Sequence, residues 1–253
     1  MKAIIMAGGE GTRLRPLTCT IPKPMVPIVG TPVMEHIINL LKEHDINDIA
    51  ATLYYHPNII KDYFGDGSKF SINLSYFTEE SPLGTGGSVL NTGEFLNDTV
   101  IVISGDAITD IDLIDAVKFH KRNKSVATLV LKRQPIPLEY GIVILDDENK
   151  IVRFLEKPSW GEVFSDTVNT GIYILEPEAF SHYKKGDVFD FSKDLFPKLL
   201  KEKAPMFGYI TDSYWSDIGD LKTYMSTNFD ALGGKIKLYN KFSGNRLNSQ
   251  ISN

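Results

Sequence analysis

The stretch KAIIMAGGEGTRLRPLTCTIPKP, residues 2–24, joins a short apolar run to a loop rich in glycine, proline and cationic side chains. Its first six residues predict a buried β-strand. The glycines permit a tight turn after that strand, and backbone N–H groups in such a loop can face a phosphate chain. Arg13 follows closely, and Lys23 stands between two prolines that fix the backbone around it. We interpret the stretch as a strand followed by a stiff cationic loop that binds polyphosphate.

Two common phosphate-binding motifs do not fit this loop. The dinucleotide-binding fingerprint needs a third glycine where Leu14 stands, and the Walker loop needs a Gly-Lys-Ser/Thr run that the stretch lacks. A glycine-rich loop alone is weak evidence, because glycine serves any tight turn. The combination of glycines with Arg13 and a rigidly held Lys23 is what favours a polyphosphate ligand.

The composition is that of an ordinary globular protein. The 253 residues are 42% hydrophobic and 23% charged, with a net charge of −5, so neither nucleic acid nor an anionic membrane is an expected partner. Cys19 is the only cysteine, which excludes an internal disulfide, and we interpret it as an unactivated thiol. No apolar run suits a signal peptide core or the roughly 20 residues of a membrane span. We therefore expect a cytoplasmic protein.

Strand and helix patterns alternate through the first half of the chain. After the first strand, further strands are expected over residues 47–53, 70–77 and 99–106. Helices are expected from Pro32 to His44 and over residues 110–123. This alternation is typical of βαβ units in a mostly parallel sheet, where ligand-binding groups gather at the carboxyl ends of the strands.

The second half of the chain has a different order of predicted strands and helices. Consecutive strand-like runs cover residues 125–133, 139–146, 150–158 and 168–176, and helical periodicity returns over 190–203 and 219–232. Successive strands without intervening helices indicate mixed rather than purely parallel pairing. We therefore predict an α/β fold with a Rossmann-like mixed, mostly parallel sheet flanked by helices.

The opening motif also carries a family resemblance. GGEGTRLRPLTCTIPKP, residues 8–24, closely resembles the signature of sugar-1-phosphate nucleotidyltransferases, also called nucleotide-sugar pyrophosphorylases. Further segments match in order: PLGTGGSV (82–89), SGDAITD (104–110), FLEKP (154–158), VNTGIYIL (168–175) and YWSDIGDLKTY (214–224). Details of EYGIV, NTGIYIL and WSDIG look most like mannose-1-phosphate guanylyltransferases. The resemblance implies the nucleotide-diphospho-sugar transferase fold.

The resemblance covers roughly residues 1–232, which are expected to form the nucleotidyltransferase catalytic domain. Residues 233–253 are polar with weak periodicity and are expected to be a tail, a linker or the start of a missing C-terminal domain. Some relatives continue into further domains after this point. A homo-oligomer is also compatible with the family.

The implied reaction is attack by a sugar-1-phosphate oxygen on the α-phosphorus of a nucleoside triphosphate, which expels pyrophosphate. Both substrates are anions, so catalysis is mainly positioning and charge neutralisation. The resemblance implies Mg²⁺ as cofactor, held by Asp106 and Asp217, and a catalytic set of Arg13, Lys23, Asp106, Lys157 and Asp217. Mg²⁺ suits so sparse an oxygen site because it takes other ligands from water and substrate.

Residue by residue, the resemblance implies two binding sets. The nucleotide would be held around Ala7, Gly8, Gly9, Gly11, Thr12 and Arg13, and further along the chain by Glu79, Gly84 and Asp106. The sugar phosphate would be held by Gly141, Glu156, Lys157 and Asn169. Without the family pattern, Glu156 and Lys157 would be interpreted as a solvated strand end before Pro158.

The acidic residues have rival interpretations. Asp106 also suits a turn after Gly105, and Asp217 also suits a cap for a helix starting near Gly219. Asp110 and Asp112 form an Asp-x-Asp that binds metal in some glycosyltransferases. Because Asp115 follows Asp112 by three residues, we prefer a helix start for this pair.

Glu79 bears on the choice of base. Relatives that use uracil or thymine typically carry glutamine near this position, whereas one carboxylate can accept the two adjacent donors of guanine together. Glu79, or alternatively Glu80, therefore favours GTP, and solvated loop carboxylates are the competing interpretation. Together with the resemblance, this residue predicts synthesis of GDP-mannose, or a closely related nucleotide sugar, from GTP and mannose 1-phosphate. The alternatives are a glucose-1-phosphate thymidylyl- or uridylyltransferase, and a catalytically silent nucleotide-sugar-binding regulatory paralogue.

Overall fold

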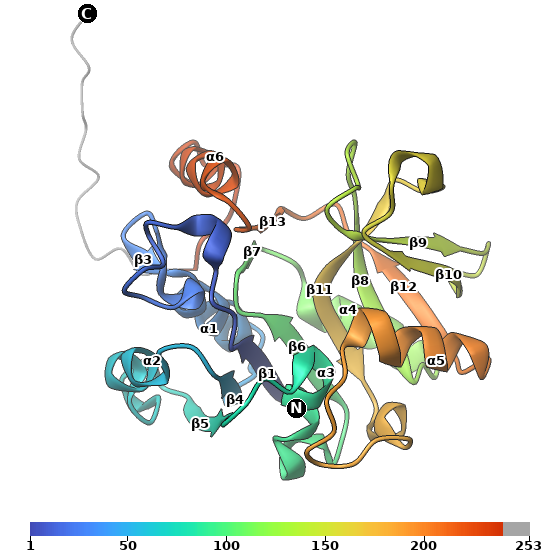
Figure 1. Cartoon of the computed structure of the whole chain (residues 1–253), viewed down its shortest axis with the longest axis horizontal. Coiled ribbons are helices and arrows are strands. Elements are labelled where there is room, and N and C mark those ends of the chain that lie inside the picture. The colour runs from blue at the N-terminus through green and yellow to red at the C-terminus, as the bar shows by residue number, and fades with distance from the viewer. Residues whose placement is uncertain (240–253) are drawn as a thin grey trace, which may run out of the picture.

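The computed structural model describes residues 1–239 and contains a nine-stranded mixed sheet with helices on both faces (Figure 1). Four parallel strands make up its first half: β5 (Asn73–Thr78), β4 (Asp48–Leu53), β1 (Lys2–Ala7) and β6 (Val100–Ser104). The predicted α/β fold class is confirmed, and each strand expected in this half forms within a few residues of its predicted range.

The second half adds mostly antiparallel pairs. β11 (Thr167–Leu175) runs antiparallel to β6 on one side and to β8 (Ala127–Arg133) on the other, and β12 (Met206–Ile210) lies parallel to β8. β9 (Gly141–Leu145) and β10 (Ile151–Glu156) form an antiparallel pair that joins β11 through Val168 and Ile142. The mixed pairing expected after residue 125 is therefore confirmed, and β12 is a strand that the sequence analysis missed.

The strands at the centre of the sheet are buried on both faces, as their continuous apolar runs require. In β1, Ala3, Ile4, Ile5 and Ala7 are each 0% exposed. Ile5 belongs to one core cluster and Ile4 to the other, so successive side chains pack on opposite faces of the sheet.

Six α-helices flank the sheet in the described residues: α1 (Val33–Glu43), α2 (Pro57–Phe64), α3 (Gly84–Leu90), α4 (Leu113–Arg122), α5 (Phe196–Lys201) and α6 (Leu221–Leu232). The helix expected over 190–203 begins as a π-helix, η7 (Phe191–Leu195), and continues as α5. The helix α3 was not expected, because the run GTGGSVL has poor intrinsic helix propensity.

Two short pairs stand beside the main sheet. β2 (Pro27–Ile28) pairs with β3 (Thr31–Pro32), and β7 (Ala107–Thr109) pairs antiparallel with β13 (Trp215–Asp217). Ala107 lies opposite Asp217 in the second pair, and Ile218 N–H donates to the carbonyl oxygen of Asp106 at 3.1 Å. This pairing brings Asp106 and Asp217 together across 111 positions of sequence.

The residues that follow α6 still contact the domain. Ile236 is 5% exposed, and Lys237 N–H donates to Asp110 Oδ2 at 3.0 Å. Residues 240–253, the rest of the predicted tail or linker, lie outside the described residues, so the domain boundary stays a prediction. Across residues 1–239, none of the helices has the length and apolar character needed to cross a bilayer.

The Asp-x-Asp pair divides between two roles. Asp112 Oδ1 accepts Asp115 N–H at 2.9 Å as the N-cap of α4, as predicted. Asp110 does not begin the helix; its Oδ1 accepts Tyr214 N–H at 2.8 Å, and its Oδ2 accepts Lys237 N–H. Asp110 therefore fastens the chain before and after α6 to the end of β7.

The cap assignment makes a stability prediction. Asp112→Ala is expected to lower the free energy of unfolding by about 1 kcal/mol, because α4 loses the acceptor of its N-terminal N–H group. Asp112→Asn keeps a cap oxygen and is expected to unfold close to wild type, as measured by urea denaturation. If Mg²⁺ stabilised the wild type and Asp112→Asn abolished that effect, Asp112 would be a metal ligand instead.

Candidate active site

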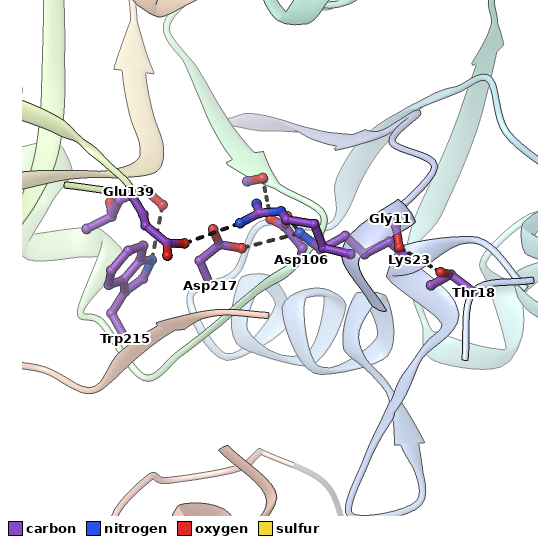
Figure 2. A network of polar contacts seen from close by, with 10 residues as sticks. Gly11, Thr18, Lys23, Asp106, Glu139, Trp215 and Asp217 are labelled. Carbon is purple, nitrogen blue, oxygen red and sulfur yellow. Dashed lines mark hydrogen bonds and ion pairs between the residues drawn. The ribbon is translucent and has the colours of Figure 1, made fainter. Parts of the chain in front are cut away.

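The central feature of the site is the ammonium group of Lys23, which points between two carboxylates (Figure 2). Lys23 Nζ donates to Asp106 Oδ2 and lies 3.4 Å from Asp217 Oδ1. Asp106 follows the end of β6 and also accepts a hydrogen bond from Ser104 Oγ. The side chains are 13%, 20% and 30% exposed for Lys23, Asp106 and Asp217, so the cluster is largely withdrawn from water.

The backbone holds Lys23 firmly in this position. Pro22 and Pro24 flank it at the start of a 3₁₀ turn, in which Met25 N–H donates to the Pro22 carbonyl at 2.8 Å. Gly11 packs behind it with φ of +65°, and a Cβ on Gly11 would lie 3.0 Å from the Cβ of Lys23. A side chain on Gly11 would push against Lys23, so this glycine has a packing role.

The shared burial shifts the pKa values of the three groups. Burial alone lowers the pKa of Lys23, but the charges of Asp106 and Asp217 outweigh it and raise that pKa above 10.5. For Asp106, burial is opposed by the Lys23 charge and hydrogen bonds, which lower its pKa. Burial and repulsion from Asp106 raise the pKa of Asp217 well above 3.8. One ammonium is therefore shared unequally by two carboxylates.

A cavity of about 340 Å³ opens on one side of the cluster. We call it the glycine pocket; its lining includes Gly8, Gly9, Glu79, Gly84 and both Lys23 and Asp106. Glu79 is half-buried, its Oε2 accepts Leu83 N–H at 2.9 Å, and burial raises its pKa. Glu80 is exposed and does not line the cavity.

A smaller cavity of about 180 Å³ opens on the other side. We call it the Asn169 pocket; its lining includes Gly141, Glu156, Lys157 and Asn169, together with Asp106 and Asp217. All four residues predicted to bind the sugar phosphate therefore border one cavity. A Cβ on Gly141 would lie 2.7 Å from Phe154 Cζ and 2.8 Å from Glu156 Oε2, so a side chain at this position would displace the ends of both neighbours.

Side chains on β11 and β13 complete the Asn169 pocket. Asn169 is buried, and its Nδ2 donates to Tyr173 Oη at 2.9 Å. Trp215 Nε1 donates to the Thr170 carbonyl at 3.1 Å (Figure 2). The Trp215 ring also contacts the Tyr140 ring edge-on, with 5.3 Å between the ring centroids. Tyr140, Tyr173 and Trp215 are lining residues that the sequence analysis did not assign, although each lies within or beside a matched motif.

Some predicted residues lie apart from the glycine pocket. Arg13 lines the Asn169 pocket instead, and its Nη1 lies 3.2 Å from Glu139 Oε2 in an exposed ion pair. Ala7 is fully buried in β1, and Gly11 and Thr12 border neither pocket. Their assignment to nucleotide binding stays a prediction.

Comparison of this chain with known proteins identifies a family and several relatives. Residues 2–233 match the model of the nucleotidyl transferase family. The chain is 39% identical over 251 residues to a UTP–glucose-1-phosphate uridylyltransferase of Synechocystis sp., with 94% of this chain and 65% of that protein covered. It is 36% identical over 234 residues to a mannose-1-phosphate guanylyltransferase of Mycobacterium tuberculosis, with 92% of this chain and 65% of that protein covered.

A solved structure also resembles this one. It is a putative glucose-1-phosphate thymidylyltransferase from Bacillus anthracis in complex with a sucrose, with a TM-score of 0.83, 26% sequence identity, and coverage of 94% of this chain and 96% of that chain. The chain spans about 65% of the length of the two curated relatives above. The matched residues include both pockets and the Lys23 cluster, and the chain belongs to the nucleotidyl transferase family.

Proposed function

We propose that this chain transfers a nucleoside monophosphate from a nucleoside triphosphate to a sugar 1-phosphate and releases pyrophosphate. The observation that carries the proposal is the position of Lys23, Asp106 and Asp217 where the glycine pocket and the Asn169 pocket meet. A triphosphate in the first pocket and a sugar phosphate in the second would bring their phosphate groups to this cluster.

Charge neutralisation is the main task of the site. Two unit charges about 4 Å apart repel by roughly 4 kcal/mol at an effective dielectric constant near 20, so the two anionic substrates need cations between them. Lys23 supplies a buried ammonium at the junction. Arg13 is paired with Glu139 only at the surface, an interaction worth about 1 kcal/mol or less, so Arg13 can exchange that carboxylate for a phosphate.

In the proposed reaction, a phosphate oxygen of the sugar 1-phosphate forms a bond to the α-phosphorus of the nucleotide. The bond between that phosphorus and the α–β bridging oxygen breaks, and its electron pair leaves with pyrophosphate. The chain supplies position and charge and needs no covalent intermediate. Lys23 and Arg13 stabilise the leaving group, Lys157 holds the sugar phosphate, and Glu156 and Asn169 accept or donate to sugar hydroxyls.

The carboxylates fit the expected Mg²⁺. Lys23 supplies one ammonium to two carboxylates, and burial and repulsion from Asp106 raise the pKa of Asp217, so a further cation would stabilise both carboxylates in the ionised form. Within residues 1–239, no three His, Cys, Asp or Glu side chains gather into a metal site, so the other ligands would come from water and substrate. Bound there, Mg²⁺ would neutralise phosphate charge and orient the reacting groups.

We further propose GTP and mannose 1-phosphate as substrates, and GDP-mannose as product. Glu79 supports this choice, because its carboxylate borders the glycine pocket and only its Oε2 accepts the Leu83 N–H. A guanylyltransferase is among the relatives, but so is a uridylyltransferase of slightly higher identity, and it makes uridylyl transfer the main rival. The cytoplasmic location and a homo-oligomeric state stay predictions.

A substrate screen tests the reaction and its specificity. Purified protein with Mg²⁺ is expected to release pyrophosphate fastest from GTP with mannose 1-phosphate, among five nucleoside triphosphates crossed with mannose 1-phosphate and glucose 1-phosphate. Asp106→Asn is expected to lower kcat at least about a hundredfold, because a charge that holds the reacting groups is lost. Asp112→Asn, which alters a carboxylate outside both pockets, is the matched control. Nucleotide binding without release from any pair would support a regulatory protein instead.

The charge imbalance at Lys23 predicts how the protein responds to Mg²⁺ alone. In Lys23→Met the two carboxylates lose their shared ammonium and repel each other, so the melting temperature is expected to fall. Mg²⁺ is then expected to raise the melting temperature more in Lys23→Met than in wild type, because the ion replaces the missing charge. Equal Mg²⁺ responses in both proteins would count against a metal site at Asp106 and Asp217.

The base assignment predicts a selective effect. Glu79→Gln is expected to lower kcat/KM for GTP about tenfold while changing the value for UTP much less, because an amide offers one acceptor where guanine presents two donors. Glu80→Gln, at the exposed neighbour, is expected to leave both values close to wild type. An equal loss with every nucleotide would refute a role for Glu79 in base choice.

A further inference from the structure

One wall of the glycine pocket is built from two segments, of which the predicted binding residues include only Gly84. The amino end of α3 packs against the segment Asp187–Ser192, which leads into the π-helix η7. Gly86 N–H and Gly87 N–H both donate to the Phe189 carbonyl at 3.0 Å, and Phe189 N–H donates to the Leu83 carbonyl at 3.0 Å. Two segments about a hundred residues apart are thereby joined backbone to backbone.

The glycines of the GTGG run are explained by this close approach. A Cβ on Gly84 would lie 2.5 Å from the Phe189 carbonyl oxygen, one on Gly86 2.3 Å from the Phe189 ring, and one on Gly87 2.4 Å from the Asp187 carbonyl oxygen. Contacts this short exclude any side chain. Because glycines carry no side chains, the first turn of α3 depends on hydrogen bonds for its orientation.

Asp190 supplies the side-chain part of those bonds. Its Oδ1 accepts Thr85 N–H at 3.0 Å and Thr85 Oγ1–H at 3.1 Å, and Thr85 Oγ1 in turn accepts Phe191 N–H at 3.0 Å. The first bond satisfies an N–H group at the start of α3 that has no partner within the helix. Asp190 and Thr85 both border the glycine pocket, and the Asp190 carboxylate is 36% exposed.

The same segment reaches the second pocket. Ser192, two residues after Asp190, borders the Asn169 pocket, so one short peptide forms part of both walls. Asp190 directly precedes the π-helix η7, and Ser192 lies within it. Such helices are rare in proteins, and those that occur are often found at functional sites.

We propose that Asp190 is a positioning residue for nucleotide binding: its carboxylate fixes Thr85 and the first turn of α3 as the wall against which the nucleotide rests. The proposal rests on the proposed function, since the ligand of this pocket is taken to be a nucleoside triphosphate. Asp190 acts through Thr85, so it affects how tightly the nucleotide is held more than the chemical step.

The test measures binding apart from turnover. The five nucleoside triphosphates of the substrate screen are titrated by calorimetry into wild type, Asp190→Ala and Asp190→Asn, without sugar phosphate. For whichever nucleotide the wild type binds, Asp190→Ala is expected to raise Kd about tenfold, equivalent to about 1.4 kcal/mol. Asp190→Asn keeps an oxygen that can accept both Thr85 donors, so its Kd is expected within about twofold of wild type. In steady-state assays Asp190→Ala is expected to raise KM for the nucleotide with little change in kcat.

Matched variants separate positioning from general stability. Asp187→Ala removes a carboxylate of the same segment that accepts Lys184 N–H. Asp187 lies against α3 with its backbone carbonyl, which the substitution keeps, so Kd is expected to be unchanged. Thr85→Val is expected to weaken binding as Asp190→Ala does, whereas Thr85→Ser retains the hydroxyl and is expected to bind as wild type. These two variants test the same link if Asp190→Ala folds poorly.

Two results would overturn the inference in different ways. If wild type binds a nucleotide and Asp190→Ala binds it equally well, even with a lower melting temperature, Asp190 has a structural role only and the proposed function stands. If wild type binds none of the five nucleoside triphosphates at millimolar concentration, the proposed function fails and the positioning role fails with it.

Discussion

The contact of Lys23 with Asp106 and Asp217 is the interaction on which the rest of the site depends. It joins a proline-braced loop after β1, the end of β6 and the short strand β13, which are far apart in sequence. Without the ammonium, two partly buried carboxylates would repel each other at the meeting point of both pockets. The pairing of β7 with β13 sets the separation of the carboxylates, and the stiff loop sets the position of the cation between them.

Several glycines lie where two segments of the chain come close to each other beside the site. Gly105 is one example, since a Cβ there would lie 2.7 Å from the Met6 carbonyl oxygen and would push the Asp106 loop away from β1. Gly11 and Gly141 leave room for side chains instead, including those of Lys23 and Glu156. A glycine-rich motif can therefore indicate close packing of the chain around a ligand site as well as close approach of the backbone to a phosphate.

The mixed sheet assigns the two pockets to different parts of the fold. The parallel strands β1, β4 and β6 end at the glycine pocket (Figure 1). Of the predicted sugar-phosphate set, Gly141, Glu156 and Asn169 lie on β9, β10 and β11, and Lys157 directly follows β10. β6 and β11 are neighbours in the sheet, so the change from parallel to antiparallel pairing falls beside Asp106. Because ligand groups gather where strand order changes, the junction of the pockets lies where this architecture favours it.

The sequence by itself determined the parallel first half and the mixed second half of the sheet, the strand and loop that present Lys23, and the N-cap at Asp112. Each of these features depends on the periodicity or turn residues of a short segment, which can be recognised without the fold. Its motif residues also marked most of the lining of both pockets. Only the tertiary structure decided that Asp106 and Asp217 share one ammonium, that Asp110 holds the chain around α6, and that Asp190 braces α3. These depend on contacts between distant segments. A glycine-rich helix such as α3 has little propensity of its own, and it forms because Phe189 and Asp190 supply the hydrogen bonds that its sequence does not predict.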